Sequence, residues 1–108
     1  SGDLSMLNQA LLRYHDQLGD LCRHFRVRRL EVFGSACRTD FNAESSDLDF
    51  LVEFEDMEPR VYADAYFGLL EALADLYQRP VDLVVRSAVK NPYFIQSIDE
   101  DRALLYAA

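Results

Sequence analysis

The sequence lacks the features that define several common classes of protein. It has no apolar run long enough to cross a bilayer, and its first residues lack the charged, apolar and small-residue regions of a secretory signal. Its two cysteines, Cys22 and Cys37, have no CxxC spacing, which argues against a disulfide scaffold or a zinc site. We therefore expect a cytoplasmic protein with reduced thiols and no membrane partner.

Positive charge is also scarce in this chain. There are 11 Lys and Arg residues against 19 Asp and Glu residues, which gives a formal net charge of -8. Proteins that hold nucleic acids through general electrostatics need a surplus of positive charge, so a nucleic acid is a disfavoured partner. A basic segment from Arg23 to Arg29 is either a docking patch for an acidic partner or a solvated helix end, and we favour the second interpretation.

The spacing of apolar residues predicts a small α/β fold. The chain has 108 residues, half of them hydrophobic, which suits one domain over residues 1–108 with a single core. Apolar positions three and four apart predict two long helices, and alternating or β-branched residues predict three strands. After Asn91-Pro92 we expect a turn into a last short helix. The expected fold is a mixed β-sheet of about three strands flanked by helices, with earlier elements near 4–25, 30–33, 47–54, 59–77 and 81–85.

Three aspartates interrupt the predicted strands. Asp47 and Asp49 open the second strand and share one face of it, and Asp82 lies within the third strand. Each alone is most simply a solvent-facing acid, but three clustered carboxylates repel one another unless a cation lies among them. Oxygen ligands of this kind suit Mg²⁺ or Mn²⁺. We therefore predict a metal site at Asp47, Asp49 and Asp82, provided that the sheet register brings the three acids together.

A Gly-Ser pair follows the first predicted strand. At Gly34 and Ser35 a phosphate group can approach the backbone closely, and N–H groups at the start of a following helix would face it. The pair alone is weak evidence of a site. Followed by Asp-x-Asp at the next strand and a single Asp in a third, it supplies the separate needs of phosphoryl transfer. The order of these motifs predicts an enzyme that acts on a nucleoside triphosphate.

The same motifs carry a family resemblance. The stretch "GSACRTDFNAESSDLDFLVEF", followed by "VDLVV", resembles the minimal nucleotidyltransferases of the DNA polymerase beta superfamily. The signature of that family is Gly-Ser, a spacer, Asp-x-Asp and a later single Asp. The segments "KNPYFIQSI" and "LLYAA" are similar to the small antitoxin-type members. The resemblance covers most of the chain from Phe33 onward and implies the nucleotidyltransferase fold.

The resemblance implies nucleotide-binding roles for three residues. Gly34 and Ser35 would contact the nucleotide phosphates, and Arg38 matches an arginine that often follows the Gly-Ser pair. Two departures from the family pattern are visible. The spacer between Ser35 and Asp47 is one residue longer than usual, which a polar turn can absorb, and Thr39 stands where glycine usually follows the arginine. The threonine would bring strain if that position needs a positive φ.

The resemblance also implies a reaction. Asp47 and Asp49 would hold two Mg²⁺ ions, and Asp82 would complete the site and help to activate the acceptor hydroxyl. The enzyme would transfer an NMP group, in the first place AMP from ATP, to a hydroxyl and release pyrophosphate. Because the chain has no length for an acceptor-binding domain, the hydroxyl must come from another molecule. The family implies a HEPN-type toxin as that partner, with this chain as the antitoxin that adenylylates a toxin tyrosine or masks it.

Alternatives stay open at this point. The chain could keep the fold and neutralise its partner by contact alone, or act as a free-standing transferase on RNA or a small molecule, and a homo-oligomer is also compatible with the sequence. Tyr93 and Phe94 fit the core of the last helix and an exposed binding surface equally well. Cys37 lies in the predicted site loop, but no histidine lies near it in sequence, so we expect an inert thiol.

Overall fold

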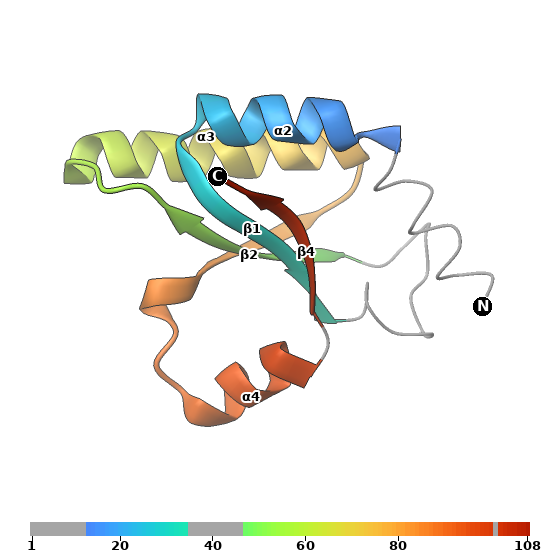
Figure 1. The fold of residues 1–108 in the computed structure, drawn as a ribbon, viewed down its shortest axis with the longest axis vertical. Coiled ribbons are helices and arrows are strands. Elements are labelled where there is room, and N and C mark those ends of the chain that lie inside the picture. Colours follow the sequence, from blue (N-terminus) through green and yellow to red (C-terminus); the bar gives the residue numbers. More distant parts are fainter. Residues whose placement is uncertain (1–12, 35–46, 101) are drawn as a thin grey trace.

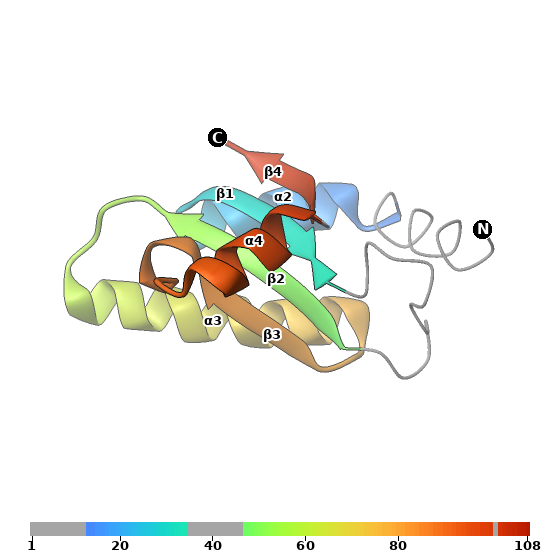
Figure 2. The ribbon, with the colours of Figure 1, turned by 90° about the horizontal axis from the view of Figure 1, so that it is seen from below.

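The structure is a computed structural model that describes residues 13–34, 47–100 and 102–108. Its strands form a single four-stranded sheet with helices on both sides (Figure 1). α2 and α3 cover one face of the sheet, and α4 lies against the other face (Figures 1 and 2). In chain order the elements are α2 (His15–His24), β1 (Val27–Phe33), β2 (Leu48–Phe54), α3 (Pro59–Tyr77), β3 (Val81–Val85), the short 3-10 helix η2 (Arg86–Ala88), α4 (Pro92–Glu100) and β4 (Arg102–Ala107).

The sheet is mixed, as the sequence predicted. The strand order is β3-β2-β1-β4, in which β1 runs antiparallel to both β2 and β4. β2 and β3 are parallel to each other. Parallel neighbours need a long crossover connection, and α3 supplies it by carrying the chain back along the sheet.

β4 is a strand that the sequence pattern did not reveal. The segment Arg102–Ala107 pairs antiparallel with β1 and makes the sheet one strand wider than expected. Leu104 is 52% exposed, whereas Leu105 and Tyr106 pack against the core, so the strand shows no clean alternation of apolar and polar residues. Pairing with β1 decides the conformation of this segment, and such non-local pairing leaves little trace in a short sequence.

α4 begins where Asn91-Pro92 predicted a turn into a helix. The side-chain Oδ1 of Asn91 accepts hydrogen bonds from the backbone N–H groups of Tyr93 at 2.9 Å and Phe94 at 3.4 Å. Pro92 occupies the first helical position, where its missing N–H would have no partner in the helix. Capping by Asn and a proline at this position together fix the start of the helix.

α3 begins at Pro59, as predicted, and is the longest helix described. It ends at Tyr77, because the next residue, Gln78, has a left-handed φ of 54°. The side-chain amide of Gln78 donates a hydrogen bond to the carbonyl of Asp75 at 2.6 Å. The Tyr66 hydroxyl donates a hydrogen bond of 2.6 Å to the carbonyl of Leu83 and ties the helix to β3. Neither α3 nor any other helix in the described ranges is long and apolar enough to cross a membrane.

The larger hydrophobic core lies between the sheet and the layer formed by α2 and α3. Alternate residues of β2 point into it, as the strand pattern predicted, namely Leu48, Phe50, Val52 and Phe54. The helices fill the other side of this core with Leu18, Cys22, Leu69 and Leu73. Burying side chains of this size stabilises a fold by roughly 1.5–3 kcal/mol each, so this layer supplies most of the hydrophobic stabilisation.

α2 and α3 approach each other closely at one glycine. A Cβ atom at Gly68 of α3 would lie 2.5 Å from the Cε1 atom of the Phe25 ring, which follows α2. Any side chain at position 68 would therefore push the aromatic ring away. Close packing at this end holds the two helices against the same face of the sheet.

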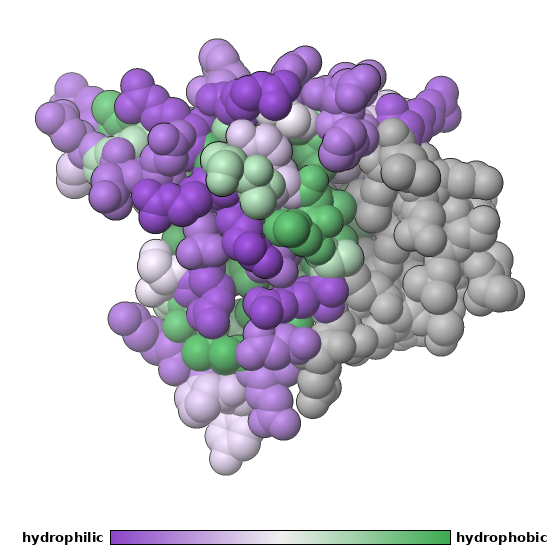
Figure 3. Space-filling view, viewed as in Figure 1, coloured by the Kyte–Doolittle hydropathy of each residue, from purple (hydrophilic) through white to green (hydrophobic). Residues whose placement is uncertain are grey.

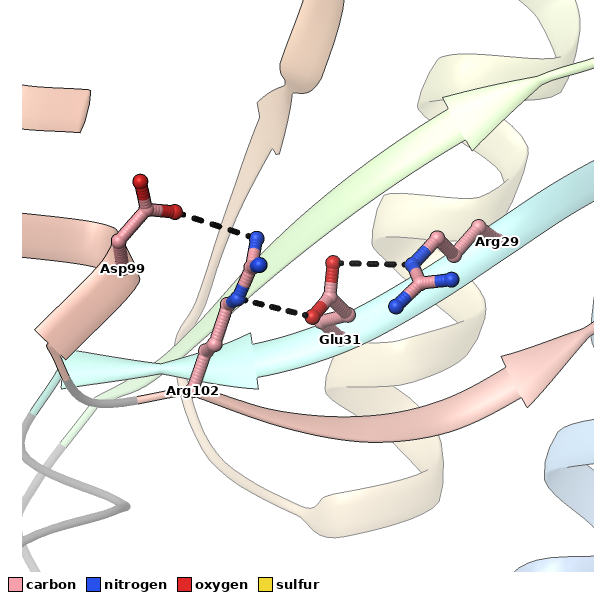
Figure 4. A network of polar contacts seen from close by, with 4 residues as sticks. All are labelled: Arg29, Glu31, Asp99 and Arg102. Atoms are coloured by element: carbon pink, nitrogen blue, oxygen red, sulfur yellow. Dashed lines mark hydrogen bonds and ion pairs between the residues drawn. The ribbon is translucent and has the colours of Figure 1, made fainter. Parts of the chain in front are cut away.

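The opposite face of the sheet has a smaller apolar cluster and a charged network. Phe33, Leu51 and Ile98 form the cluster. Beside it the buried carboxylate of Glu31 contacts Arg29 Nε at 3.2 Å and Arg102 Nε at 3.5 Å (Figure 4).

 Arg102 Nη1 also contacts the Asp99 carboxylate of α4 at 3.2 Å, so this network links β1, β4 and α4.

Candidate active site

Two of the three predicted acids lie next to each other in the sheet. Asp49 of β2 and Asp82 of β3 are partners in the register of the parallel pair. Partners in neighbouring parallel strands point to the same face, and neighbouring strands lie about 5 Å apart. Phe33 of β1 is the antiparallel partner of Asp49, which places the three side chains in one row across the sheet. The row lies on the face that α4 covers in part, so the register brings these two acids together.

The third acid, Asp47, immediately precedes β2. It is exposed, whereas Asp49 is half-buried. The backbone N–H of Leu48 donates a hydrogen bond of 3.1 Å to the carbonyl of Pro80, so pairing with the chain of β3 reaches the very start of β2. Because strand side chains alternate with a period of two, Asp47 falls on the same side as Asp49, just before the N-terminal end of β2.

Gly34 lies directly against the Asp49 carboxylate. Its φ of 73° is in the left-handed region, which glycine adopts without strain. A Cβ atom at this position would lie only 2.6 Å from Asp49 Oδ2. Glycine is therefore required here for two reasons, its backbone conformation and the space that the carboxylate occupies. A ligand held by Asp49 would also meet the bare backbone of Gly34.

Several predicted site residues lie outside the described part of the chain. Ser35 and Arg38, the two further residues expected to bind the nucleotide, belong to this group, as do Cys37 and Thr39. The roles given to Ser35 and Arg38 stay predictions.

The donor chemistry of the site suits a hard divalent cation. Carboxylate oxygens on neighbouring strands are the ligands that Mg²⁺ prefers in proteins. However, within residues 13–34, 47–100 and 102–108 no group of three or more His, Cys, Asp or Glu side chains is placed to hold a metal ion. The side chains of Asp47, Asp49 and Asp82 therefore share one region of the sheet without forming a closed ligand set, and their metal-binding role stays a prediction.

One aromatic side chain of α4, Phe94, lies against this row of residues. The Phe94 ring meets the Phe33 ring edge to face, with 6.2 Å between the ring centroids. Phe94 is 40% exposed and Tyr93 is 82% exposed, so neither is a core residue. Of the two interpretations drawn from the sequence, the exposed surface is the one that fits.

The remaining reactive groups are placed as solvent-facing or inert residues. Burial raises the pKa of the Cys22 thiol from 9.0 to about 12, which keeps it protonated and unreactive at neutral pH. His24 is exposed at the end of α2, and Arg23 pairs with Asp20 at 2.5 Å. The basic segment thus behaves mainly as a solvated helix end, as favoured from the sequence, although Arg29 joins the network around Glu31.

That network is the feature near the site that sequence reasoning missed. Glu31 is only 5% exposed, and it lies on the same strand face as Phe33, the partner of Asp49. The signal was present as an alternation of Arg29, Glu31 and Phe33 along β1. Without knowledge of β4, however, nothing in the sequence indicated that Arg102 would complete the charge balance.

Comparison with known proteins identifies the family and agrees with the fold. Residues 16–105 match the family described as "Nucleotidyltransferase domain". A chain of Methanocaldococcus jannaschii, provisionally named a protein adenylyltransferase, is 38% identical over 91 residues, which cover 84% of this chain and 87% of the relative.

Solved structures share the fold. One, provisionally described as a minimal nucleotidyltransferase, has a TM-score of 0.69 and 27% sequence identity, and the match covers 88% of this chain and 92% of the other. Another is a Shewanella oneidensis complex of a tri-AMPylated HEPN toxin with an MNT antitoxin. Its TM-score is 0.62 at 19% identity, with 91% of this chain and 73% of the other covered.

Proposed function

Because the chain belongs to the nucleotidyltransferase domain family, we propose that it transfers an AMP group from ATP to a hydroxyl group of a partner protein and releases pyrophosphate. The resemblance noted in the sequence is confirmed at the level of this family. The observation that carries the proposal is the registered pair Asp49 and Asp82, which lies beside the bare backbone of Gly34. The name of the M. jannaschii relative supports a protein as the acceptor.

In this proposal each residue has a separate task. The backbone at Gly34 admits the phosphate groups of the nucleotide, and Ser35 and Arg38 add contacts to them. Asp47 and Asp49 hold the divalent cation, with Asp82 beside them, and a bound Mg²⁺ would neutralise charge on the phosphate oxygens. Asp82 is exposed on the edge strand β3, so a hydroxyl of another molecule can reach it.

In the proposed reaction, a hydroxyl group replaces pyrophosphate on the α-phosphorus of ATP. The hydroxyl oxygen attacks the α-phosphorus of ATP, and its proton passes to the Asp82 carboxylate. The new O–P bond forms as the bond from the α-phosphorus to the bridging oxygen of pyrophosphate breaks. The products are the AMP ester of the partner and pyrophosphate.

We propose a HEPN-type toxin as the partner, with this chain as its antitoxin. Support comes from the fold shared with the MNT antitoxin of the Shewanella oneidensis complex, in which the toxin is tri-AMPylated. A toxin tyrosine is the natural acceptor in this scheme, because its phenol can lose a proton to a nearby carboxylate as it attacks.

Label transfer from α-³²P-ATP tests the proposal. The purified chain, Mg²⁺ and a HEPN-type protein encoded beside its gene are incubated together, and the native chain is compared with Asp47→Asn/Asp49→Asn. The matched control is Asp56→Asn/Asp64→Asn, which removes two exposed acids outside the site. We expect label on the partner with the native and control chains and none with the site variant.

The same assay separates catalysis from simple contact. If the site variant still binds and silences the toxin as well as the native chain does, the protein acts as a binding module and the enzymatic proposal is wrong. Label that appears equally with all three chains would also overturn the proposal, because the acids would then have no part in the transfer.

A further inference from the structure

A groove runs between α2 and α3, away from the candidate site. It has a volume of about 500 Å³ and is lined by Gln17, Asp20, Leu21, Ala72, Asp75 and Leu76. The two helices lie side by side and run in opposite directions, so the first half of α2 faces the last part of α3 (Figures 1 and 2). The groove therefore lies on the helical side of the molecule, across the sheet from Asp49 and Asp82.

Both walls of the groove repeat the same helical spacing. Residues i, i+3 and i+4 of each helix line it, and each triplet ends in a leucine, Leu21 on α2 and Leu76 on α3. Together with Ala72, these two side chains form an apolar floor, and all three are half-buried. Spacing of this kind matches the apolar stripe of another helix, which is the usual occupant of such a groove.

Acidic side chains border the apolar floor on both sides. Asp16 and Asp20 are one turn apart on α2, and Glu71 and Asp75 are one turn apart on α3. All four are exposed, and hydrophilic side chains gather along this edge of the molecule (Figure 3). Like charges one turn apart repel each other slightly, so each pair adds negative charge along its border of the groove.

Among the described residues, most of this negative charge has no ion-pair partner. Asp20 pairs with Arg23, but in the described part of the protein no ion pair involves Asp16, Glu71 or Asp75. A second copy of the chain would present the same acidic borders, and facing them against each other would cause repulsion. The charge pattern instead complements a positively charged occupant.

We propose that this groove binds an amphipathic helix of a partner protein, with apolar side chains on the floor formed by Leu21, Ala72 and Leu76. Lys or Arg residues beside the apolar stripe of that helix would face the acidic borders on α2 and α3. Because the groove and the candidate site lie on opposite sides of the sheet, a partner held here leaves Asp49 and Asp82 accessible. The inference concerns binding alone and goes beyond the proposed AMP transfer.

Three synthetic peptides provide the test. The first is a Leu/Lys peptide designed as an amphipathic helix, the second replaces its Lys residues with Glu, and the third scrambles the first so that its apolar stripe is lost. Binding to the native chain is followed by fluorescence anisotropy, and the contact surface is mapped by backbone NMR shifts. We expect the first peptide to bind best and to shift the signals of residues 17–21 and 72–76.

Charge reversal in the groove provides the matched comparison. Glu71→Lys/Asp75→Lys should weaken binding of the Leu/Lys peptide about tenfold, because the border on α3 then repels the Lys side chains and only the border on α2 attracts them. Asp56→Lys/Asp64→Lys changes the net charge equally but lies outside the groove, and it should leave the affinity within about twofold. Circular dichroism confirms that both variants keep their helices.

Three results would overturn the proposal. Equal binding of the helical and scrambled peptides, or an equal loss in both double variants, would reduce the effect to general attraction by an acidic protein. Sedimentation that shows a dimer built through α2 and α3 would make a second copy the occupant. AMP transfer measured on the same variants reports separately on the proposed function, since neither pair of substitutions touches its residues.

Discussion

The two faces of the sheet differ in what they contain. The face under α2 and α3 is closed by a large apolar core that includes Phe50, Leu69 and Leu73, each fully buried. The face under α4 has a smaller described cluster of Phe33, Leu51 and Ile98, and it also presents the acids Asp49 and Asp82. Burying a carboxylate without a partner is costly, so chemistry that needs acids is best placed on the open face. The larger core and the proposed chemistry thus lie on opposite sides of one sheet.

Neighbouring residues of β2 offer the sharpest test of this division, because Phe50 and Leu51 point to opposite faces. Phe50→Ala should destabilise the protein by about 3–5 kcal/mol, since it opens a cavity in the larger core. Leu51→Ala should cost about 2–3 kcal/mol, because its smaller cluster can relax toward solvent. Urea unfolding of both variants measures the difference, and an equal or larger loss at Leu51 would contradict the division.

The charged network should contribute less than the core, but more than an exposed ion pair. Glu31→Ala removes a buried carboxylate that contacts Arg29 and Arg102, whose side chains are 41% and 38% exposed. We expect a loss of about 1.5–3 kcal/mol, since the hydrogen bonds involve charged groups but the arginines can turn to water. Asp20→Ala, which breaks the exposed pair with Arg23, should leave the free energy of unfolding nearly unchanged. If Glu31→Ala and Asp20→Ala lose similar amounts of unfolding free energy, the network does not stabilise the packing of α4.

Substitution of two glycines compares the candidate site with a helix outside it. Gly34→Ala should destabilise the protein by about 1–2 kcal/mol because of its left-handed φ, and should reduce AMP transfer further because the new Cβ displaces the Asp49 carboxylate. Gly19→Ala in α2 meets only ordinary contacts and should stabilise the protein by about 0.5–1 kcal/mol. Thermal unfolding and the label-transfer assay measure both effects. Full activity in Gly34→Ala would show that its backbone is not part of the site.

The buried thiol of Cys22 should make the free energy of unfolding depend on pH. Its pKa is raised by burial from 9.0 to about 12, so folding favours the protonated thiol. That contribution is fully present below pH 9 and is lost as the pH rises toward 12, at up to about 1.4 kcal/mol per pH unit. We expect the free energy of unfolding to fall between pH 9 and 10.5 by about 1.6 kcal/mol more in the native chain than in Cys22→Ala. If urea unfolding gives the same change in free energy with pH for both chains, the burial of this thiol is contradicted.

The sequence predicted local features of the fold well, because they depend on neighbouring residues. Alternation along β2 assigned Phe50 to the core and Asp49 to the other face, and Asn91 and Pro92 marked the start of α4. The sequence could not give the register that pairs Asp49 with Asp82, because register depends on strands that are distant in the chain.

The unpredicted parts share the same physical reason. β4 has no alternation of its own and takes its conformation from β1, and the partners of Glu31 depend on that pairing. The candidate site could be named from the sequence as a set of residues and motifs, whose roles stay predictions. Its arrangement beside α4 and the charged network required the structure.

The most direct test of this account measures AMP transfer and stability together in Asp82→Asn. The account predicts that the rate of label transfer from α-³²P-ATP falls by about 10²-fold or more, while the free energy of unfolding stays within about 0.5 kcal/mol of the native value. That pair of results would place chemistry, and not stability, on the open face of the sheet. Transfer at the native rate would contradict the account, because the acid that lies beside Asp49 would then have no part in the reaction.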